Sequence, residues 1–175
     1  SLAVFDTYPS LSDNNQWVDC EFFCSVDNDP NNDCIGLRTG GANTYIVGCD
    51  FHDINLGMAL GGGPMYIAFN RVYDTSRDAV NLTTGRFVTF EENVFERYIT
   101  GSAHPDCIQT FTTGTTTGSE DIIVRRNILF DPHGHGVQGL FLQANSGYNF
   151  PLKRWTIEDN LFVHSSTHGI YFETD

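Results

Sequence analysis

Short segments of alternating apolar and polar residues recur along the chain, and each carries an asparagine. The three clearest segments read VTFEENVFE, IIVRRNILFD and WTIEDNLFVH, at residues 88–96, 122–131 and 155–164. Each has an apolar residue three positions before its asparagine and another two positions after it. Because the side chains of a strand alternate between its two faces, this spacing predicts short β-strands with one buried face.

The pattern extends toward the N-terminus and forms a repeat. We expect one column of turn residues to align along the repeat: Glu21, Asp50, Asn70, Asn93, Asn127 and Asn160. Each unit continues into a second short apolar strand, and no segment shows sustained helical periodicity. Strand–turn units without helices bury their apolar side by coiling and stacking on one another.

The repeat therefore predicts an all-β fold, a right-handed parallel β-helix (solenoid) of about six coils. A single domain would span residues 1–175. Stacked amide side chains would bond to one another and to buried backbone groups at the turns, which defines an Asn ladder. The alternative is that asparagine recurs only because it favours turns.

The formal net charge of −13 and the pI near 4.5 argue against nucleic acid as a partner, because nucleic acid requires a basic surface. Every basic residue except Arg38 follows residue 70, so an anion site is expected in that part of the chain. No run of 18 apolar residues is present, so we expect no membrane span.

The sequence ends at GIYFETD, directly after an apolar strand. A solenoid needs a polar cap over its last coil. We therefore expect this chain to be part of a longer chain or assembly, in which further sequence or a partner covers the end. A homotrimer is one arrangement that would provide this cover.

Five cysteines are present, an odd number that leaves at least one thiol without a partner in the chain. Cys24 and Cys34 bracket a short polar loop, and a disulfide between them is plausible outside the cell. Cys20 is expected to stack on Cys49, which makes this pair a second candidate bridge. Alternatively, these residues are small buried thiols.

The loop between Cys24 and Cys34 is rich in oxygen ligands. Asp27, Asp29 and Asp33 alternate there with asparagines, a composition that suits Ca²⁺. The spacing does not match an EF-hand, and Pro30 occupies a position where a ligand or turn glycine is expected. The alternative is a solvated turn whose side chains bond their own backbone.

The second strand of each unit predicts a continuous surface. One column is expected to contain Asp33, Leu56, Asp78, Asp106, Gln138 and His168, and a neighbouring outward column Gly36, Ala59, Asn81, Gln109, Phe141 and Tyr171. Acids, amides and aromatic rings aligned on a flat sheet suit an extended polysaccharide, because amides bond sugar hydroxyls and rings pack on sugar faces. The outward polar residues of any β-solenoid would look similar.

Histidines and aspartates cluster in two longer inserts beside this face. His104 lies two residues from Asp106, and His133 and His135 follow Asp131. An acid that orients a histidine is the usual arrangement for a general base at neutral pH. The alternative is that these histidines are ordinary loop residues.

Proton abstraction beside a uronic acid carboxylate is the chemistry of polysaccharide lyases and C5-epimerases. It requires a base and a group that neutralises the carboxylate. His104 and His133 are the candidate bases, and Arg77, Arg125 and Arg126 are the candidate neutralising groups.

The repeat over residues 17–173 resembles the right-handed parallel β-helix proteins of the pectate-lyase-like superfamily. The segment GSAHPDCIQTFTTGTTTGSEDIIVRRNILF, residues 101–130, resembles a subset found in secreted bacterial polysaccharide-active proteins and phage tail proteins. Asp131-Pro132-His133 resembles the Asp-Pro-His core of mannuronan C5-epimerases. This chain departs from that motif at Ile128, where the family has tyrosine, and at Leu129, where it has glycine.

The resemblance implies an extracellular (secreted) or virion-surface protein. We expect polysaccharide binding along one sheet face, with lyase or epimerase activity on a uronic acid polymer as its catalytic form. The alternatives are a non-catalytic carbohydrate-binding domain, such as a tail-spike segment, and a purely structural solenoid that mediates assembly.

Overall fold

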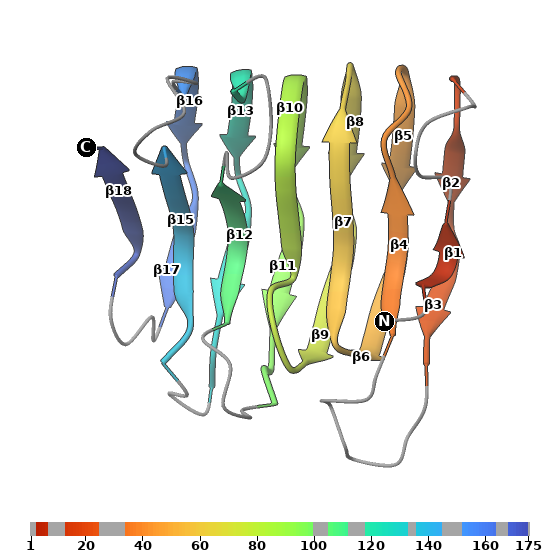
Figure 1. The fold of residues 1–175 in the computed structure, drawn as a ribbon. Helices are drawn as coiled ribbons and strands as arrows, with labels where there is room; N and C mark the ends of the chain where they lie inside the picture. The colour runs from red at the N-terminus through yellow and green to blue at the C-terminus, as the bar shows by residue number, and fades with distance from the viewer. Residues whose placement is uncertain are drawn as a thin grey trace.

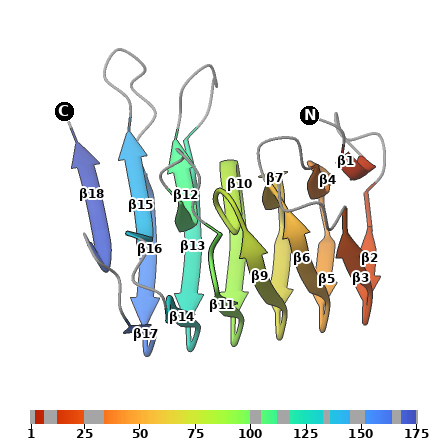
Figure 2. The same ribbon diagram turned by 90° about the horizontal axis from the view of Figure 1, so that it is seen from below.

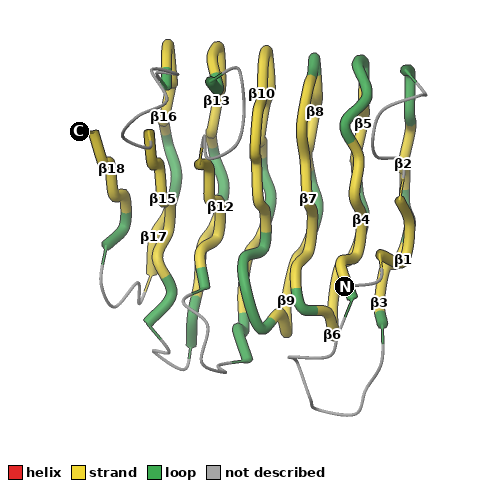
Figure 3. Tube along the Cα trace, in the orientation of Figure 1, coloured by secondary structure: helices red, strands yellow, loops and turns green. Residues whose placement is uncertain are grey.

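A computed structural model describes residues 3–6, 13–24, 34–99, 105–111, 118–132, 136–144, 152–163 and 168–174. These residues form β-strands and turns, and none of them lies in a helix (Figure 3). Within this part of the chain there is accordingly no helix long and apolar enough to cross a membrane.

The strands form three parallel sheets. The first sheet contains β1 (Ala3–Asp6), β4 (Ile35–Thr39), β7 (Leu56–Gly62), β10 (Val80–Glu91), β12 (Asp106–Phe111), β15 (Gln138–Ala144) and β18 (Ile170–Thr174). The second contains β2 (Gln16–Val18), β5 (Thr44–Val47), β8 (Met65–Ala68), the second half of β10, β13 (Glu120–Arg125) and β16 (Lys153–Glu158). The third contains β3 (Glu21–Phe23), β6 (Asp50–Ile54), β9 (Arg71–Thr75), β11 (Val94–Glu96), β14 (Ile128–Phe130) and β17 (Leu161–Val163).

The chain visits the three sheets in turn, and each strand pairs in parallel with its equivalent in the next round. β10 is long enough to serve the first and second sheets in one strand. We call one such round, with a strand from each sheet, a rung. The rungs advance along one axis, so the two chain ends lie at opposite ends of the stack (Figures 1 and 2). The predicted all-β, solenoid-like arrangement of parallel strands is therefore confirmed.

Inward-facing side chains of successive rungs stack in columns to make the core. The pairing register aligns the first sheet's fully buried residues Leu37, Met58, Val80, Ile108 and Leu140. The second sheet contributes Ile46, Ile67, Phe90 and Val124, and the third contributes Phe51, Val72, Phe95 and Leu129. Burial of each large side chain contributes roughly 1.5–3 kcal/mol, so these columns account for much of the stability.

The predicted Asn ladder is present at the turn between the second and third sheets. The backbone N–H and the Nδ2 of Asn70 both donate to Oδ1 of Asn93, at 3.0 and 2.9 Å. Asn93 bonds Asn127 in the same way, and Asn127 bonds Asn160. Each Nδ2 also donates to a backbone carbonyl of the preceding rung, at Ile46, Ile67, Phe90 and Val124 respectively.

The turn itself is made by a left-handed residue immediately before each ladder position. Positive φ angles between 51° and 66° occur at Asp19, Gly48, Phe69, Glu92, Arg126 and Asp159. This conformation bends the chain from the second sheet into the third, and it costs residues other than glycine free energy. The ladder bonds that follow offset this cost because they satisfy buried backbone groups.

The first two predicted ladder positions are wrong by one residue. The register pairs Glu21 with Asp50 and Asp50 with Arg71, and these three side chains are exposed on the outer face of the third sheet. The ladder column therefore continues through Cys49 and Cys20. The N–H of Cys49 donates to Oδ1 of Asn70 at 2.9 Å, as a ladder asparagine would. The predicted stacking of Cys20 on Cys49 is correct.

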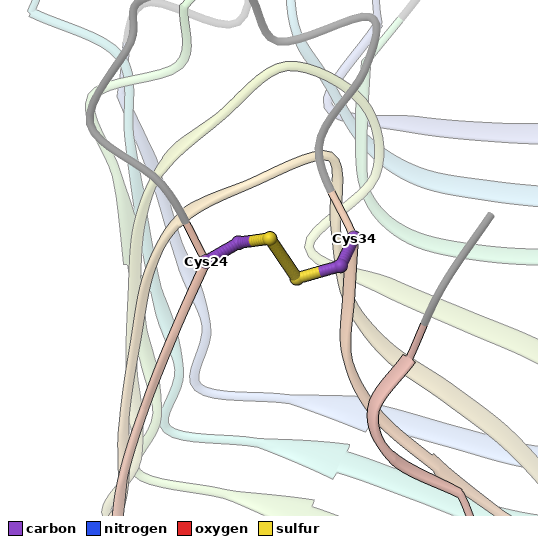
Figure 4. The surroundings of a disulfide bond; sticks show 2 residues. All are labelled: Cys24 and Cys34. Carbon is purple, nitrogen blue, oxygen red and sulfur yellow. A yellow bond between two sulfur atoms is a disulfide. The ribbon is translucent and has the colours of Figure 1, made fainter.

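A disulfide joins Cys24 and Cys34, whose Cα atoms lie 6.0 Å apart (Figure 4). This confirms the first candidate bridge. Cys24 follows β3 and Cys34 precedes β4, so the bridge ties the third sheet to the first across the intervening loop. The other cysteines, Cys20, Cys49 and Cys107, are thiols.

Candidate functional site

The outer face of the first sheet carries a column of amides followed by aromatic rings. The register aligns Asn81, Gln109, Phe141 and Tyr171, all half-buried, and we call these four residues the polar–aromatic column. Asn81 Nδ2 donates to Gln109 Oε1 at 3.2 Å. The rings of Phe141 and Tyr171 stack with centroids 5.2 Å apart and an interplanar angle of 11°.

A second column lies beside the first, three residues earlier in each strand. The side chain of Asp78 bonds Asn81, and the ring of His168 lies 5.0 Å from that of Tyr171. The register also aligns Asp106 with Gln138. The two predicted columns therefore contact each other at Asp78–Asn81 and at His168–Tyr171.

At β4 the sequence-based register of this face is wrong by two residues. Ile35 pairs with Leu56, and Arg38 pairs with Ala59. Asp33 was expected beside Leu56, but it lies outside the described residues. Gly36, expected on the outward column, is instead buried, and a Cβ there would meet the backbone of Gly57 at 2.7 Å.

Three polar members of the second column are buried, whereas an exposed surface was expected. Asp78 is 3% exposed, Asp106 0% and Gln138 5%. The backbone N–H of Asp106 donates to Oδ1 of Asp78 at 3.1 Å. In β12 Asp106 lies two residues before the buried Ile108, so alternation within the strand gives both side chains the same, inward direction.

Burial also changes the acidity of the two aspartates. It raises the pKa of Asp78 to about 6, although the backbone N–H of Asp106, Arg77 and Asn81 oppose this rise. Burial, together with the nearby charge of Asp78, raises the pKa of Asp106 to about 8. At neutral pH Asp106 therefore retains its proton, while Asp78 is largely ionised.

Asp131, the third predicted acid, lies at the same corner of the stack. It follows β14 and is buried, and its backbone N–H donates to the carbonyl of Val163 at 3.2 Å. Asp78, Asp106 and Asp131 all raise the pKa of the Cys107 thiol, after the larger effect of burial. They therefore lie near Cys107, and we call these three carboxylates the acidic corner.

A small pocket opens at the acidic corner. It is lined by Cys107, Asp131 and Gln138, together with Tyr98, two residues of β14 (Leu129 and Phe130) and Val163 of β17. The Tyr98 hydroxyl donates to Sγ of Cys107 at 3.0 Å, and burial raises the pKa of this tyrosine well above its usual value.

The other predicted site residues do not gather on one face of the first sheet, and several of them lie outside the described residues. Arg77 is exposed beside Asp78. Arg125 is on the outer face of the second sheet, where it donates to Glu91 at 3.0 Å, so it does not face the polar–aromatic column. His104, His133 and His135 lie outside the described residues, as do Asp27, Asp29 and Asp33. Among the residues that are described, no group of three or more His, Cys, Asp or Glu side chains could hold a metal ion.

The acidic corner can hold and transfer a proton, because a protonated Asp106 lies beside an ionised Asp78. Asp106 is fully buried, however, and a group that transfers a proton to a substrate must come within hydrogen-bonding distance of it. The partly exposed amides and rings of the polar–aromatic column are the groups that a ligand can reach. The described geometry thus favours binding along this face over chemistry at the corner.

Sequence reasoning missed Tyr98 and the pocket role of Cys107. Tyr98 follows a strand of the third sheet and shows no alternation that would place it inside the corner. Cys107 directly follows Asp106 in the sequence. Its place in the pocket could have been inferred only if the sequence had shown that Asp106 is buried.

No protein-family model, curated protein sequence or solved structure matches this chain. Its function must therefore be argued from the geometry of the first sheet and its acidic corner.

Proposed function

We propose that this chain is a carbohydrate-binding domain that holds an extended polysaccharide along the outer face of the first sheet. The observation that carries this proposal is the polar–aromatic column, in which the Asn81–Gln109 amide pair continues in line into the Phe141–Tyr171 ring stack. Amides bond sugar hydroxyls and aromatic rings pack against sugar faces. Neighbouring rungs repeat at about 4.8 Å, so the column offers contacts at regular intervals along a polymer.

The proposal includes a right-handed β-helix of about six coils, of the kind found in the pectate-lyase-like superfamily, acting outside the cell or on a virion surface. Parallel stacked sheets and the Asn ladder support this fold. The Cys24–Cys34 bridge supports the location, because disulfides persist in oxidising compartments.

Removing one ring of the stack tests the binding surface. Phe141→Ala or Tyr171→Ala should weaken polysaccharide binding by about tenfold, since each change removes stacking and buried area on the order of 1.4 kcal/mol. Affinity electrophoresis through gels that contain alginate, pectate or a neutral glucan would identify a bound polymer, and calorimetry would measure the change in affinity.

Tyr45→Ala is the matched control. Tyr45 is an exposed ring on the second sheet, 6.5 Å from the ring of Tyr66, so its loss should leave binding unchanged. Absence of binding to every polymer in the panel would refute the proposal. An equal loss in Tyr45→Ala would move the surface to another sheet.

Lyase or C5-epimerase activity on a uronic acid polymer is the catalytic extension of this proposal. The nearness of Asp106 and Asp131 around Cys107 supports it. Incubation with alginate or pectate tests it, because lyase cleavage creates unsaturated uronates that absorb ultraviolet light. No rise in absorbance, and no change in uronate composition, would leave the protein as a binding domain.

A structural role in assembly is the second candidate. Ile128 and Leu161, paired neighbours on the outer face of the third sheet, are both exposed. Exposed apolar neighbours of this kind mark protein contact sites when the patch is large. Light scattering distinguishes this role, since a homotrimer or larger assembly would support it and a monomer would oppose it.

A further inference from the structure

Two thiols occupy the places that asparagines fill elsewhere in the ladder. The register pairs Glu21 with Asp50, so the preceding residues, Cys20 and Cys49, are neighbours on adjacent rungs. The N–H of Asp50 donates to the carbonyl of Cys20 at 2.9 Å, which continues the parallel pairing through this pair. Cys20 and Cys49 thus follow the same left-handed turn as Asn70 and its successors.

The thiols reproduce the ladder bonds in a weaker form. Sγ of Cys49 donates to the carbonyl of Trp17 at 3.5 Å, the equivalent of the 2.9 Å bond from Asn70 Nδ2 to Ile46. Sγ of Cys20 donates to the carbonyl of Val18 at 3.3 Å. Only the bond from Cys49 to Trp17 joins two rungs, and because a thiol is a poor donor it holds them together less well than an amide does.

The geometry of the pair suits a covalent bond. Paired residues on adjacent parallel strands have Cα atoms roughly 4.8 Å apart, inside the range of about 4.4–6.8 Å that disulfides adopt. The two side chains interact with each other directly. Cys20 is partly exposed, whereas Cys49 is buried, so a reagent from solvent can reach Cys20.

We propose that Cys20 and Cys49 are a redox-modifiable pair that closes to a second disulfide on exposure to a low-molecular-weight disulfide. The thiolate of Cys20 attacks the reagent, which forms a mixed disulfide and releases one equivalent of small thiol. The thiolate of Cys49 then attacks the Cys20 sulfur, forms the Cys20–Cys49 bond and releases a second small thiol. The pair loses two electrons and two protons, and the reagent is reduced to two thiols.

This bond would clamp the first two rungs at the end of the stack where the amide ladder stops. The ladder joins the rungs from Cys49 to Asn160 through amide bonds, and the new bridge would extend that connection covalently to Cys20. The Cys24–Cys34 bridge already present shows that the same end of the protein accommodates an oxidised pair. The inference is independent of the proposed carbohydrate binding.

Thiol counting tests the inference. The folded protein is incubated with oxidised glutathione at about pH 8, then denatured, alkylated and weighed by mass spectrometry. Before oxidation three thiols, Cys20, Cys49 and Cys107, should be alkylated. After oxidation only Cys107 should be, and peptide mapping should recover a Cys20–Cys49 cross-link.

Two variants make the result specific. Cys107→Ser should lose its last alkylated site but still form the cross-link, whereas Cys20→Ser should keep Cys49 and Cys107 alkylated after oxidation. The denaturant midpoint of the oxidised protein should exceed that of the reduced protein, and Cys20→Ser should abolish the difference. Three alkylated thiols after oxidation, or a glutathione adduct on Cys20 that never resolves, would overturn the proposal.

Discussion

At the scale of single residues, the clearest departure from ordinary chemistry is the buried aspartate pair. Asp106 has a pKa of about 8 and Asp78 of about 6, against an ordinary value of 3.8. A carboxyl group whose pKa is higher in the folded state favours folding at low pH, where it is protonated in both states. That contribution is lost as the pH rises from the ordinary pKa through the folded-state value.

Asp106→Asn should therefore stabilise the protein at alkaline pH. The amide resembles the protonated acid but cannot ionise, so at about pH 9 the free energy of unfolding should rise by several kcal/mol. At about pH 3 the carboxyl is mostly protonated in both the folded and the unfolded state, so the difference should be close to zero. Urea denaturation at the two pH values measures this change.

Asp121→Asn is the contrasting control. Asp121 is partly exposed, and its bonds with Arg154 lower its pKa, so its replacement should cost a little stability near neutral pH. If Asp106→Asn instead destabilises the protein by the same amount at both pH values, ionisation of Asp106 does not lower the stability of the folded state.

At the scale of elements, the Asn ladder holds the turn between the second and third sheets. Asn93 is fully buried, and its side chain accepts two bonds from Asn70 and donates to Ile67 and Asn127. A buried polar group left without its partner costs about 1–3 kcal/mol. Asn93→Ala removes the hydrogen-bond partner of buried groups on Asn70, Ile67 and Asn127.

We expect Asn93→Ala to lower the free energy of unfolding by about 3 kcal/mol. Asn160→Ala should cost less, because Asn160 is only half-buried and its remaining groups can bond to water. Thermal and urea unfolding of both variants, with circular dichroism as the signal, would rank them. Equal losses would show that the ladder position, and not burial, sets the cost.

The ladder also shows how far sequence reasoning could reach. Asn93, Asn127 and Asn160 were placed correctly because apolar residues at fixed offsets define each turn. Glu21 and Asp50 were placed on the ladder because acidic residues resemble asparagine in such a pattern. The residues that in fact occupy those ladder positions are Cys20 and Cys49, and a cysteine does not resemble asparagine. The polar–aromatic column followed from alternation alone. The burial of Asp106 and the pairing of Arg125 with Glu91 depend on contacts between rungs. No local sequence pattern specifies these contacts.

At the scale of the whole molecule, protection of the core differs along the stack. Ile170 and Phe172 of β18 pair with Leu140 and Leu142 of β15. The β15 residues are fully buried, whereas Ile170 is 39% exposed and Phe172 53%. Each rung contacts mainly its neighbours, so a rung covered on one side should open more readily than one covered on both.

Hydrogen exchange should therefore be slowest in β7, β10 and β13 and fastest at both ends of the described stack, in β1, β2 and β3 and in β16, β17 and β18. Central strands should exchange more slowly because a neighbouring rung must open before their backbone amides become accessible to solvent. Mass spectrometry of exchanged peptides measures it in the intact chain. Uniform exchange across all strands would show that the stack opens as one cooperative unit.

The in-register parallel pairing of equivalent strands has a consequence for how such a protein changes over time. Because each round bonds chiefly to the rounds on either side, duplication or deletion of one unit would leave every remaining junction with a compatible partner. The length of such a protein can thus change by whole repeat units without further substitutions in the units that remain.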